Sequence, residues 1–248
     1  KTNRNEMSAG VRMRTKNNIK IKFRKEIKIM NYIPGIIKET SNGYFSLSLM
    51  DELMSNREIY CLGEINQESA GALILQLKYL ERQDSEKEIT MYISSPGGEV
   101  ASGLAIYDIM HSIKCPIRTV CMGTAASFGA VLFAAGQRRE MLPHSRLMIH
   151  DPLIAGNGIT GSATSLAERV DDLMKNRKIL GTLLAQNTGK TIDQIYSKTA
   201  KDTWFTAEEA VDFGLADSII QLEQGKEKDL LTEQENLSQE TESELPFE

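Results

Sequence analysis

Between residues 58 and 220 the sequence alternates short apolar runs with longer amphipathic stretches, and this alternation constrains the fold most. The apolar runs cover residues 58–62, 89–93 and 117–122, and the amphipathic stretches cover 67–82 and 101–113. Short apolar runs are typical of buried strands, whereas apolar residues at positions i, i+3, i+4 and i+7 indicate helices. Strands that alternate with helices are typical of repeated βα units, so we expect an α/β fold.

The pattern changes after residue 150. Glycines interrupt residues 156–161, and a long helix with one polar face is predicted from residue 165 to residue 186. Apolar residues form a stripe along this helix, and we expect the stripe to lie in the core. The stripe consists of Leu166, Val170, Leu173, Leu180 and Leu184. A glycine-broken strand followed by a long helix can form an arm, so this part of the chain is a candidate for packing against another subunit.

Charge and cysteine content exclude several classes of function. Residues 1–30 carry ten basic and two acidic residues, whereas residues 221–248 carry two basic and nine acidic residues. Because the whole chain has a net charge of −5, the part between them is acidic, which argues against nucleic acid as its partner. No apolar run approaches the roughly 20 residues of a membrane-spanning helix, so no membrane association is expected.

Three cysteines lie in or beside apolar runs without metal-ligand spacing, which predicts buried, reduced thiols. They are Cys61, Cys115 and Cys121.

The composition divides these 248 residues into three parts. Residues 1–29 form a basic extension without the apolar segment or cleavage site of a secretory signal. A pro-segment, a flexible extension, translated upstream sequence and a mitochondrial presequence with few serines are the alternatives for it. Residues 30–220 are the predicted folded domain. Residues 221–248 are rich in Glu, Gln and Ser, which is the composition of a disordered tail.

The most informative motif is residues 123–129, a run of mainly small residues around the hydroxyl group of Ser127. Small neighbours allow a sharp turn and let a substrate carbonyl approach the hydroxyl. The apolar residues 130–135 predict a buried helix, at whose N-terminus free amides and the helix dipole would face a developing oxyanion. The segment resembles a nucleophile elbow with alanine in place of its first glycine. Such runs also occur where a helix packs tightly on a strand, so the motif alone leaves both interpretations open.

One of the three histidines has the setting of a catalytic base. His150 ends the apolar run 147–149, a predicted buried strand, where an imidazole costs free energy unless it is hydrogen-bonded or used. His111 lies on the polar side of a predicted helix, and His144 lies in a predicted turn. His150 and Ser127 together predict a serine hydrolase, and a histidine satisfied at a strand end is the alternative.

A catalytic histidine needs a carboxylate near its second ring nitrogen. Asp151 is nearest in sequence, but adjacent strand residues point to opposite faces. Asp193 and Asp202 remain, and their spacing does not choose between them. Asp202 precedes two aromatic residues, whereas Asp193 has the setting of a solvated helix residue. Residues 96–98, Pro-Gly-Gly, follow a predicted strand and can direct amides at a bound carbonyl oxygen, as half of an oxyanion hole.

These motifs, in this order, resemble the Clp protease proteolytic subunit, a serine peptidase that works with AAA+ unfoldases. The resemblance covers residues 33–220. The matching segments are 92–98, 106–108, 121–129, 145–150, 188–190 and 207–217. It implies that Ser127 is the nucleophile, His150 the base and Asp202 the orienting acid. It also implies that the amides of Gly98 and Phe128 form the oxyanion hole.

The resemblance further implies a crotonase-like ββα superhelix with a protruding strand–helix handle. The subunits are expected to form a homo-oligomer of two stacked seven-membered rings with the active sites inside. The implied function is the ATP-independent endopeptidase core of a compartmentalised protease, which cleaves unfolded polypeptides delivered by an AAA+ unfoldase, the Clp ATPase. Neither a metal nor another cofactor is implied, and the expected location is the cytoplasm.

Two positions depart from the family pattern. Members usually carry aromatic residues where this chain has Thr90 and Ser112, and both positions contribute to the surface pocket that receives the unfoldase loop. Tyr92 and Met122 of that pocket match the family. The resemblance therefore implies an unfoldase-docking pocket at these four residues, with a partner or an affinity that can differ. The segment after Pro152 and the acidic tail differ as well.

Two other functions compete with this hypothesis. A non-catalytic ring subunit of a mixed complex would be marked by the loss of triad residues, which this chain keeps. A crotonase-type acyl-CoA enzyme would use a similar oxyanion hole without a Ser–His–Asp set. The sequence shows no acidic pair placed for proton transfer to a CoA thioester.

Overall fold

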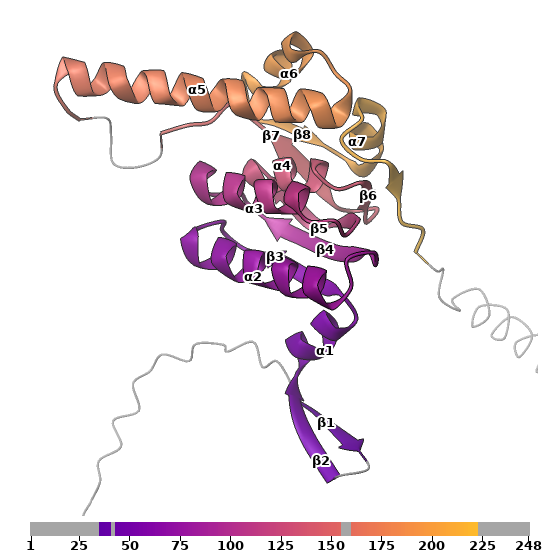
Figure 1. The fold of residues 1–248 in the computed structure, drawn as a ribbon. Helices are drawn as coiled ribbons and strands as arrows, with labels where there is room; N and C mark the ends of the chain where they lie inside the picture. Colours follow the sequence, from indigo (N-terminus) through magenta and orange to yellow (C-terminus); the bar gives the residue numbers. More distant parts are fainter. Residues whose placement is uncertain (1–34, 41–42, 155–159, 223–248) are drawn as a thin grey trace, which may run out of the picture.

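The structure is a computed structural model that describes residues 35–40, 43–154 and 160–222 (Figure 1). The predicted extension 1–29 and the predicted tail, apart from residues 221 and 222, lie outside the described residues. Most of the glycine-broken segment after residue 155 lies outside them too.

A seven-stranded and mainly parallel sheet forms the centre of the molecule. Its main path runs through β3 (Glu58–Leu62), β4 (Ile89–Ser95), β5 (Ile117–Ala126), β6 (Arg138–Met141) and β9 (Ser218–Ile219). β7 (Arg146–Ile149) pairs in parallel with the end of β5, and β8 (Thr203–Phe205) pairs antiparallel with β7. The predicted α/β class is confirmed. The predicted strand 117–122 is longer than expected, because β5 continues to Ala126.

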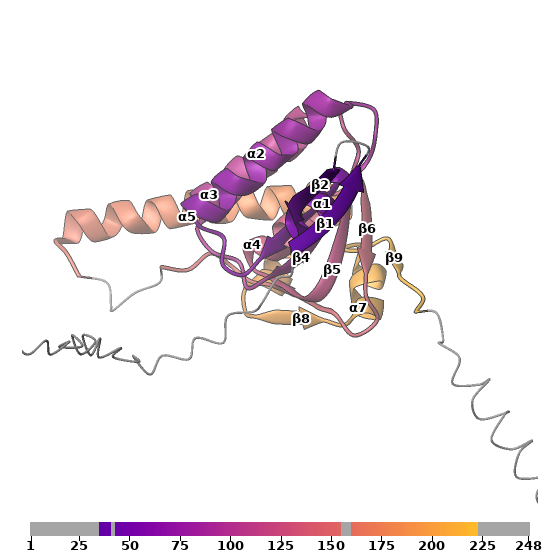
Figure 2. The same ribbon diagram turned by 90° about the horizontal axis from the view of Figure 1, so that it is seen from below.

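Three helices cover one face of this sheet, namely α2 (Gln67–Gln83), α3 (Val100–Ser112) and α4 (Phe128–Ala134). Figure 1 shows α2 and α3 side by side, and in the view of Figure 2 α2 lies in front of α3. Ile89, Met91 and Ile93 of β4 are fully buried, while the residues between them are partly exposed. Burial with a period of two is what a strand with one covered face requires. The core therefore lies between the sheet and these helices.

Several helices begin at capping boxes that can be read from the sequence. At α2 the Asn66 side chain accepts from the Ser69 amide, and the Ser69 hydroxyl accepts from the Asn66 amide. Thr191 and Thr206 cap α6 (Ile192–Thr199) and α7 (Ala207–Phe213) in the same reciprocal way. Each cap satisfies amides that have no partner inside the helix.

A hairpin of β1 (Gly35–Thr40) and β2 (Gly43–Ser48) precedes the sheet. The short helix α1 (Leu49–Ser55) connects this hairpin to the sheet. Figure 1 shows the hairpin projecting from the body of the molecule. Ile37 and Tyr44 are 73% and 75% exposed, so the hairpin contributes little to the core of this chain. The residue pattern described above does not predict these three elements.

The long helix α5 (Ala163–Thr188) extends slightly beyond the predicted 165–186. Leu180 and Leu184 in its C-terminal half are buried. Its N-terminal half projects from the molecule in Figure 1, and Val170 there is 51% exposed. Leu166 and Leu173 are only partly buried. The prediction that the whole stripe lies in the core is therefore wrong for its first half, because periodicity identifies the apolar face but not what covers it.

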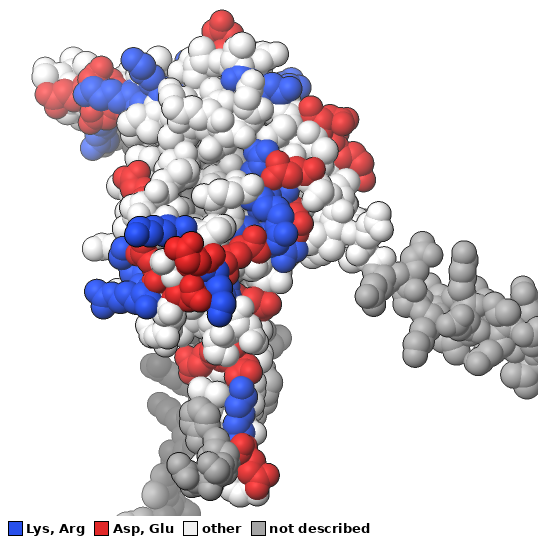
Figure 3. Space-filling view, turned by 45° about the vertical axis from the view of Figure 1, so that its right-hand side comes forward, with Lys and Arg blue, Asp and Glu red and all other residues white. Residues whose placement is uncertain are grey.

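Acidic and basic side chains are interleaved on the surface seen in Figure 3. Arg138 of β6 pairs with Glu88 at 2.7 Å, and Arg118 of β5 pairs with Glu140 of β6. The exposed pair of Arg138 with Glu88 contributes about 0–1 kcal/mol, whereas the pair of Arg118 with Glu140 is partly buried. The buried apolar residues between sheet and helices therefore dominate the stability of the fold.

Gly103 in α3 allows a test of how α3 packs on α4, and Gly71 in α2 serves as the control. A Cβ atom on Gly103 would overlap the ring of Phe128, whereas one on Gly71 meets no atom within 4 Å outside its own helix. We expect Gly103→Ala to destabilise the fold by about 1–3 kcal/mol through overpacking. Gly71→Ala should be neutral or stabilising by up to about 1 kcal/mol, because alanine favours helices. Urea unfolding measures both changes, and equal stability of the two variants would contradict this packing.

Candidate active site

The pairing of β5 with β7 places the predicted nucleophile beside the predicted base. Ala126, the last residue of β5, is the partner of Met148 in β7. Ser127 and His150 therefore follow two neighbouring parallel strands. The carboxyl ends of parallel strands lie at the same edge of a sheet, which is where α/β folds bind ligands.

The pairing of β7 with β8 adds the third group. Ile149 is the partner of Thr203, so Asp202 lies opposite His150 across an antiparallel pair. Residues directly opposite each other in such a pair have Cβ atoms about 4.5–5.5 Å apart. Strand register thus brings residues from three parts of the sequence to one place.

The backbone at Ser127 adopts a conformation that few residues other than glycine adopt. Its φ is 54° and its ψ is −123°. Ser127 donates its amide to the carbonyl of Met148 at 2.9 Å, and its own carbonyl accepts from Ala130 and Val131 in α4. Gly97 lies so close that a Cβ atom there would be 2.6 Å from that of Ser127. The sharp turn expected from the small residues is present, and strained turns of this kind expose a nucleophile.

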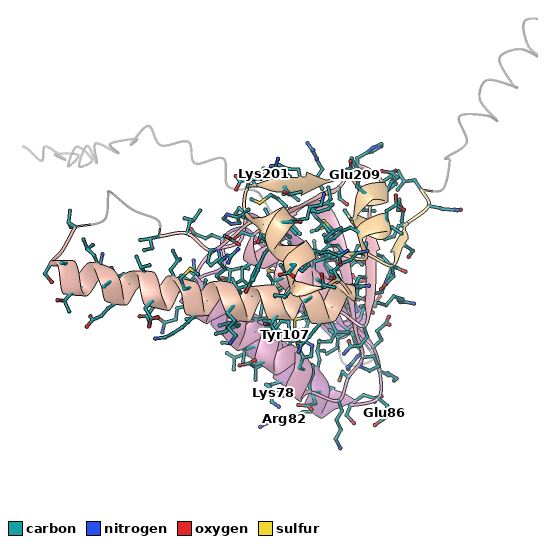
Figure 4. All side chains as sticks on the ribbon, turned by 90° about the horizontal axis from the view of Figure 1, so that it is seen from above. Lys78, Arg82, Glu86, Tyr107, Lys201 and Glu209 are labelled. Atoms are coloured by element: carbon teal, nitrogen blue, oxygen red, sulfur yellow. The ribbon has the colours of Figure 1, made fainter. Side chains whose placement is uncertain are left out.

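The side chains of Ser127, His150 and Asp202 lie in a row. The Ser127 Oγ is 2.8 Å from His150 Nε2, which is hydrogen-bond distance. His150 Nδ1 is 3.6 Å from the nearest carboxylate oxygen of Asp202, which is longer than a hydrogen bond. The His150 side chain is 13% exposed and that of Asp202 is 68% exposed. The row is therefore open to solvent at Asp202. Lys201, the residue before Asp202, is labelled in Figure 4.

The other two candidate acids lie in different surroundings. Asp151 accepts from Arg177 Nε at 2.7 Å and from the hydroxyl of Thr199 at 2.6 Å. Asp193 is exposed in the first turn of α6. Among the carboxylates of the described residues, only that of Asp202 lies within 4 Å of a ring nitrogen of His150.

Two backbone amides near Ser127 have no acceptor among the described residues, those of Gly98 and Phe128. Phe128 begins α4, so its amide belongs to the free N-terminus of a helix. Gly98 is bridged to Ile65, and a Cβ atom on Gly98 would collide with the Ile65 backbone. Glycine is therefore required where the backbone passes between Ile65 and the turn. Both amides are available to a bound oxyanion.

Ser95 holds this glycine loop in place, a role that the sequence motifs did not predict. Its hydroxyl donates to the carbonyl of Gly63 at 2.6 Å and accepts from the amide of Gly97 at 3.1 Å. Ser95 is 2% exposed, so both bonds are shielded from water. Its position directly before Pro96 at a strand end is the only sequence signal for this role.

A pocket of about 550 Å³ opens beside Ser127 and His150. Most of its other lining residues are apolar. They include Val100, Val131, Met148, Leu153, Leu180 and Leu184. Glu64, Glu99 and Asp202 are the acidic residues of the lining. Tyr107 of α3 lies beside α5 (Figure 4), and Asn187 donates to its hydroxyl at 3.4 Å, which helps to fix the wall that α5 contributes.

The residues predicted to form an unfoldase-docking pocket are distributed over two elements and a helix end. Thr90, Tyr92 and Met122 lie on the partly exposed side of β4 and β5. Tyr92 stacks on Tyr60 of β3 with ring centroids 5.0 Å apart. Ser112 is the exposed last residue of α3.

The remaining predicted groups lie as the sequence indicates. His144 is exposed in a turn, and the exposed His111 stacks on Tyr107. All three cysteines are free and buried, as predicted. Burial raises the pKa of the Cys61 and Cys121 thiols to about 11, which keeps them protonated at neutral pH.

The described residues contain no group of three or more His, Cys, Asp or Glu side chains that could hold a metal ion. No helix in these segments combines the length and the apolar character that crossing a membrane requires.

Comparison with known proteins places the chain in a family. A family model described as Clp protease matches residues 41–223. The chain is 42% identical over 193 residues to a protein from Ligilactobacillus salivarius (strain UCC118) described as an ATP-dependent Clp protease proteolytic subunit. This match covers 77% of the present chain and 96% of that protein. The chain therefore belongs to the Clp protease family, as a proteolytic subunit of the serine-peptidase class.

Proposed function

We propose that the chain is an endopeptidase whose catalytic residues are Ser127, His150 and Asp202. The observation that carries this proposal is the distance of 2.8 Å between Ser127 Oγ and His150 Nε2 at a strained turn. Two free amides border the same turn, those of Gly98 and Phe128. A hydroxyl, a base and oxyanion donors are the parts that acyl transfer needs.

The reaction would proceed in two halves. The Ser127 hydroxyl attacks the peptide carbonyl carbon while His150 Nε2 takes its proton, and the amides of Gly98 and Phe128 bind the oxyanion. The C–N bond breaks as His150 returns the proton to the leaving amine, which leaves an acyl group on Ser127. Water then adds to this ester, its proton passes through His150 to Ser127, and the carboxylic acid leaves. Asp202 holds the imidazole and stabilises its protonated form. These steps use no metal or organic cofactor.

We propose that the complete particle is two stacked heptameric rings of a crotonase-like ββα superhelix, with the active sites inside. Residues 30–220 would form the folded peptidase domain, residues 1–29 a basic extension and residues 221–248 a disordered tail. Support comes from the apolar residues along the projecting half of α5, such as Val170 and Met174, which are exposed in the single chain. Burial of such a face against a second ring would form the handle.

The partner would be an AAA+ unfoldase that docks at Thr90, Tyr92, Ser112 and Met122, in the cytoplasm. The name of the relative from Ligilactobacillus salivarius includes ATP dependence, which an ATPase partner would supply. A non-catalytic ring subunit is disfavoured by the close contact between Ser127 and His150. The reaction of an acyl-CoA enzyme would not need the contact between Ser127 and His150.

Ser127→Ala tests the nucleophile. We expect peptide hydrolysis to fall by roughly 10⁴–10⁶-fold, as for other serine peptidases that lose their nucleophile. Assembly and thermal stability should stay unchanged, because loss of one hydroxyl leaves little cavity. A fluorophosphonate probe should label the parent chain at Ser127 and leave the variant unlabelled. Activity of the variant within tenfold of the parent would refute this assignment.

A pair of asparagine variants tests the choice of acid. Asp202→Asn should lower kcat by about 10⁴-fold, because the imidazole loses the carboxylate that orients it. Asp193→Asn makes the same chemical change on the exposed surface of α6 and should alter kcat less than twofold. Steady-state assays with a fluorogenic peptide measure both values. A larger loss in Asp193→Asn would show that the acid is wrongly assigned.

The proposed chamber predicts a difference between peptides and folded proteins. The assembled protein alone should cleave short peptides without ATP, because the chemistry uses only its own residues. A stable folded protein should be degraded only when a Clp ATPase and ATP are added, since a narrow entrance admits only extended chain. Gel assays measure the degradation rate of a fluorescent folded substrate with and without the ATPase and ATP. Degradation by the isolated complex at the peptide rate would contradict the chamber.

A further inference from the structure

Asp151, the residue after the proposed base, joins three elements of the structure. It follows β7, and its amide donates to the carbonyl of Thr199 at 2.7 Å. Its carboxylate accepts from the Thr199 hydroxyl at 2.6 Å and from Arg177 Nε at 2.7 Å. Thr199 ends α6, and Arg177 lies in α5. One side chain therefore connects the strand that carries His150 with two helices.

The bonds to Thr199 control the segment that carries Asp202. The last paired residues of β7 and β8 are Ile149 and Thr203. Past this pair the two chain segments are connected again by the bonds between Asp151 and Thr199. His150 and Asp202 are thus enclosed between a strand pair and a double hydrogen bond. Their separation depends on both.

Arg177 makes this arrangement depend on the position of α5. Its guanidinium lies 3.9 Å from the ring centre of Tyr196 in α6 while its Nε binds Asp151. The ion pair is partly shielded, with 26% of the Arg177 side chain and 32% of the Asp151 side chain exposed. The helices are close here, since a Cβ atom on Gly181 of α5 would lie 2.6 Å from the Tyr196 ring. A shift of α5 would therefore be transmitted to Asp151.

We propose that Asp151 and Arg177 are positioning residues of the peptidase, and that they make the alignment of His150 with Asp202 depend on the placement of α5. This inference rests on the proposed catalytic roles of these two residues. The distance between His150 Nδ1 and Asp202 Oδ1 is 3.6 Å, so a small movement decides whether a hydrogen bond forms.

Loss of the pair between Asp151 and Arg177 should lower kcat and leave KM nearly unchanged. Neither Asp151 nor Arg177 lines the pocket beside Ser127, so substrate contacts stay the same when the pair is broken. A displacement of about 1 Å in a catalytic group can cost roughly 10²-fold in rate. We expect Arg177→Gln to lower kcat by about 10- to 100-fold and to change KM less than about twofold. Arg177→Lys keeps the charge and should recover part of the rate.

The experiment uses the full chain in its assembled state, which native mass spectrometry verifies for every variant. Lys178→Gln is the matched control, because it removes the same charge from the neighbouring exposed position of α5. Thr199→Val is a second and nearly isosteric variant that removes one bond to Asp151, and it should lower kcat as well. If Arg177→Gln fails to assemble, Thr199→Val and Arg177→Lys supply the same test.

A double-substitution cycle separates positioning from general damage to the fold. In an Asp202→Asn background, Arg177→Gln should slow fluorophosphonate labelling of Ser127 by less than about threefold, because the group it positions is already absent. An undiminished loss in that background would overturn the inference, as would an unchanged kcat in Arg177→Gln and Thr199→Val. Ser127→Ala identifies the other failure, since full activity of that variant would refute the proposed function itself.

Discussion

The pairing of β7 with β5 on one side and with β8 on the other is the interaction on which the site depends. β5 pairs first with β6 and then, near its end, with β7. This change of partner brings His150 beside Ser127, and the antiparallel β8 then returns the chain so that Asp202 faces the imidazole. A slip of one residue would turn each side chain to the other face of the sheet. The buried residues Leu147 and Ile149 oppose such a slip, since it would expose them.

The strained turn at Ser127 is possible because its surroundings are buried and rigid. A positive φ at a residue other than glycine costs of order 1–3 kcal/mol. All seven residues of α4 are buried, and full burial of one large side chain such as Phe133 contributes about 1.5–3 kcal/mol. On the other side Gly97 contacts Ser127, and Ser95 fixes the loop that carries Gly97. The strain is therefore offset locally, and the hydroxyl lies within hydrogen-bond distance of His150.

The sequence predicted the elements better than their pairing. Periodicity located α2, α3 and the first strands, and the small residues around Ser127 indicated the turn. It did not predict the hairpin 35–48, although the Asn42–Gly43 pair is a turn signal, because residue spacing gives no partner for an isolated alternating run. It could not choose between Asp193 and Asp202, because that choice depends on the register of β8, a strand of three residues. It placed Val170 in the core, since an apolar stripe looks the same whether its cover is this chain or another subunit.

The aspartates considered for the site show how surroundings assign different roles to one residue type. Asp193 is exposed, so water solvates its charge. Asp151 is adjacent to His150 in sequence, but Arg177 and Thr199 already occupy its carboxylate oxygens, which makes it a structural anion. Asp202 has no such cation, and the imidazole is its partner among the described residues. The Asp151 carboxylate is therefore fixed between α5 and the end of α6, whereas the Asp202 carboxylate faces the imidazole. Sequence adjacency to His150 thus gives Asp151 a positioning role, and strand register gives Asp202 the place beside the second ring nitrogen.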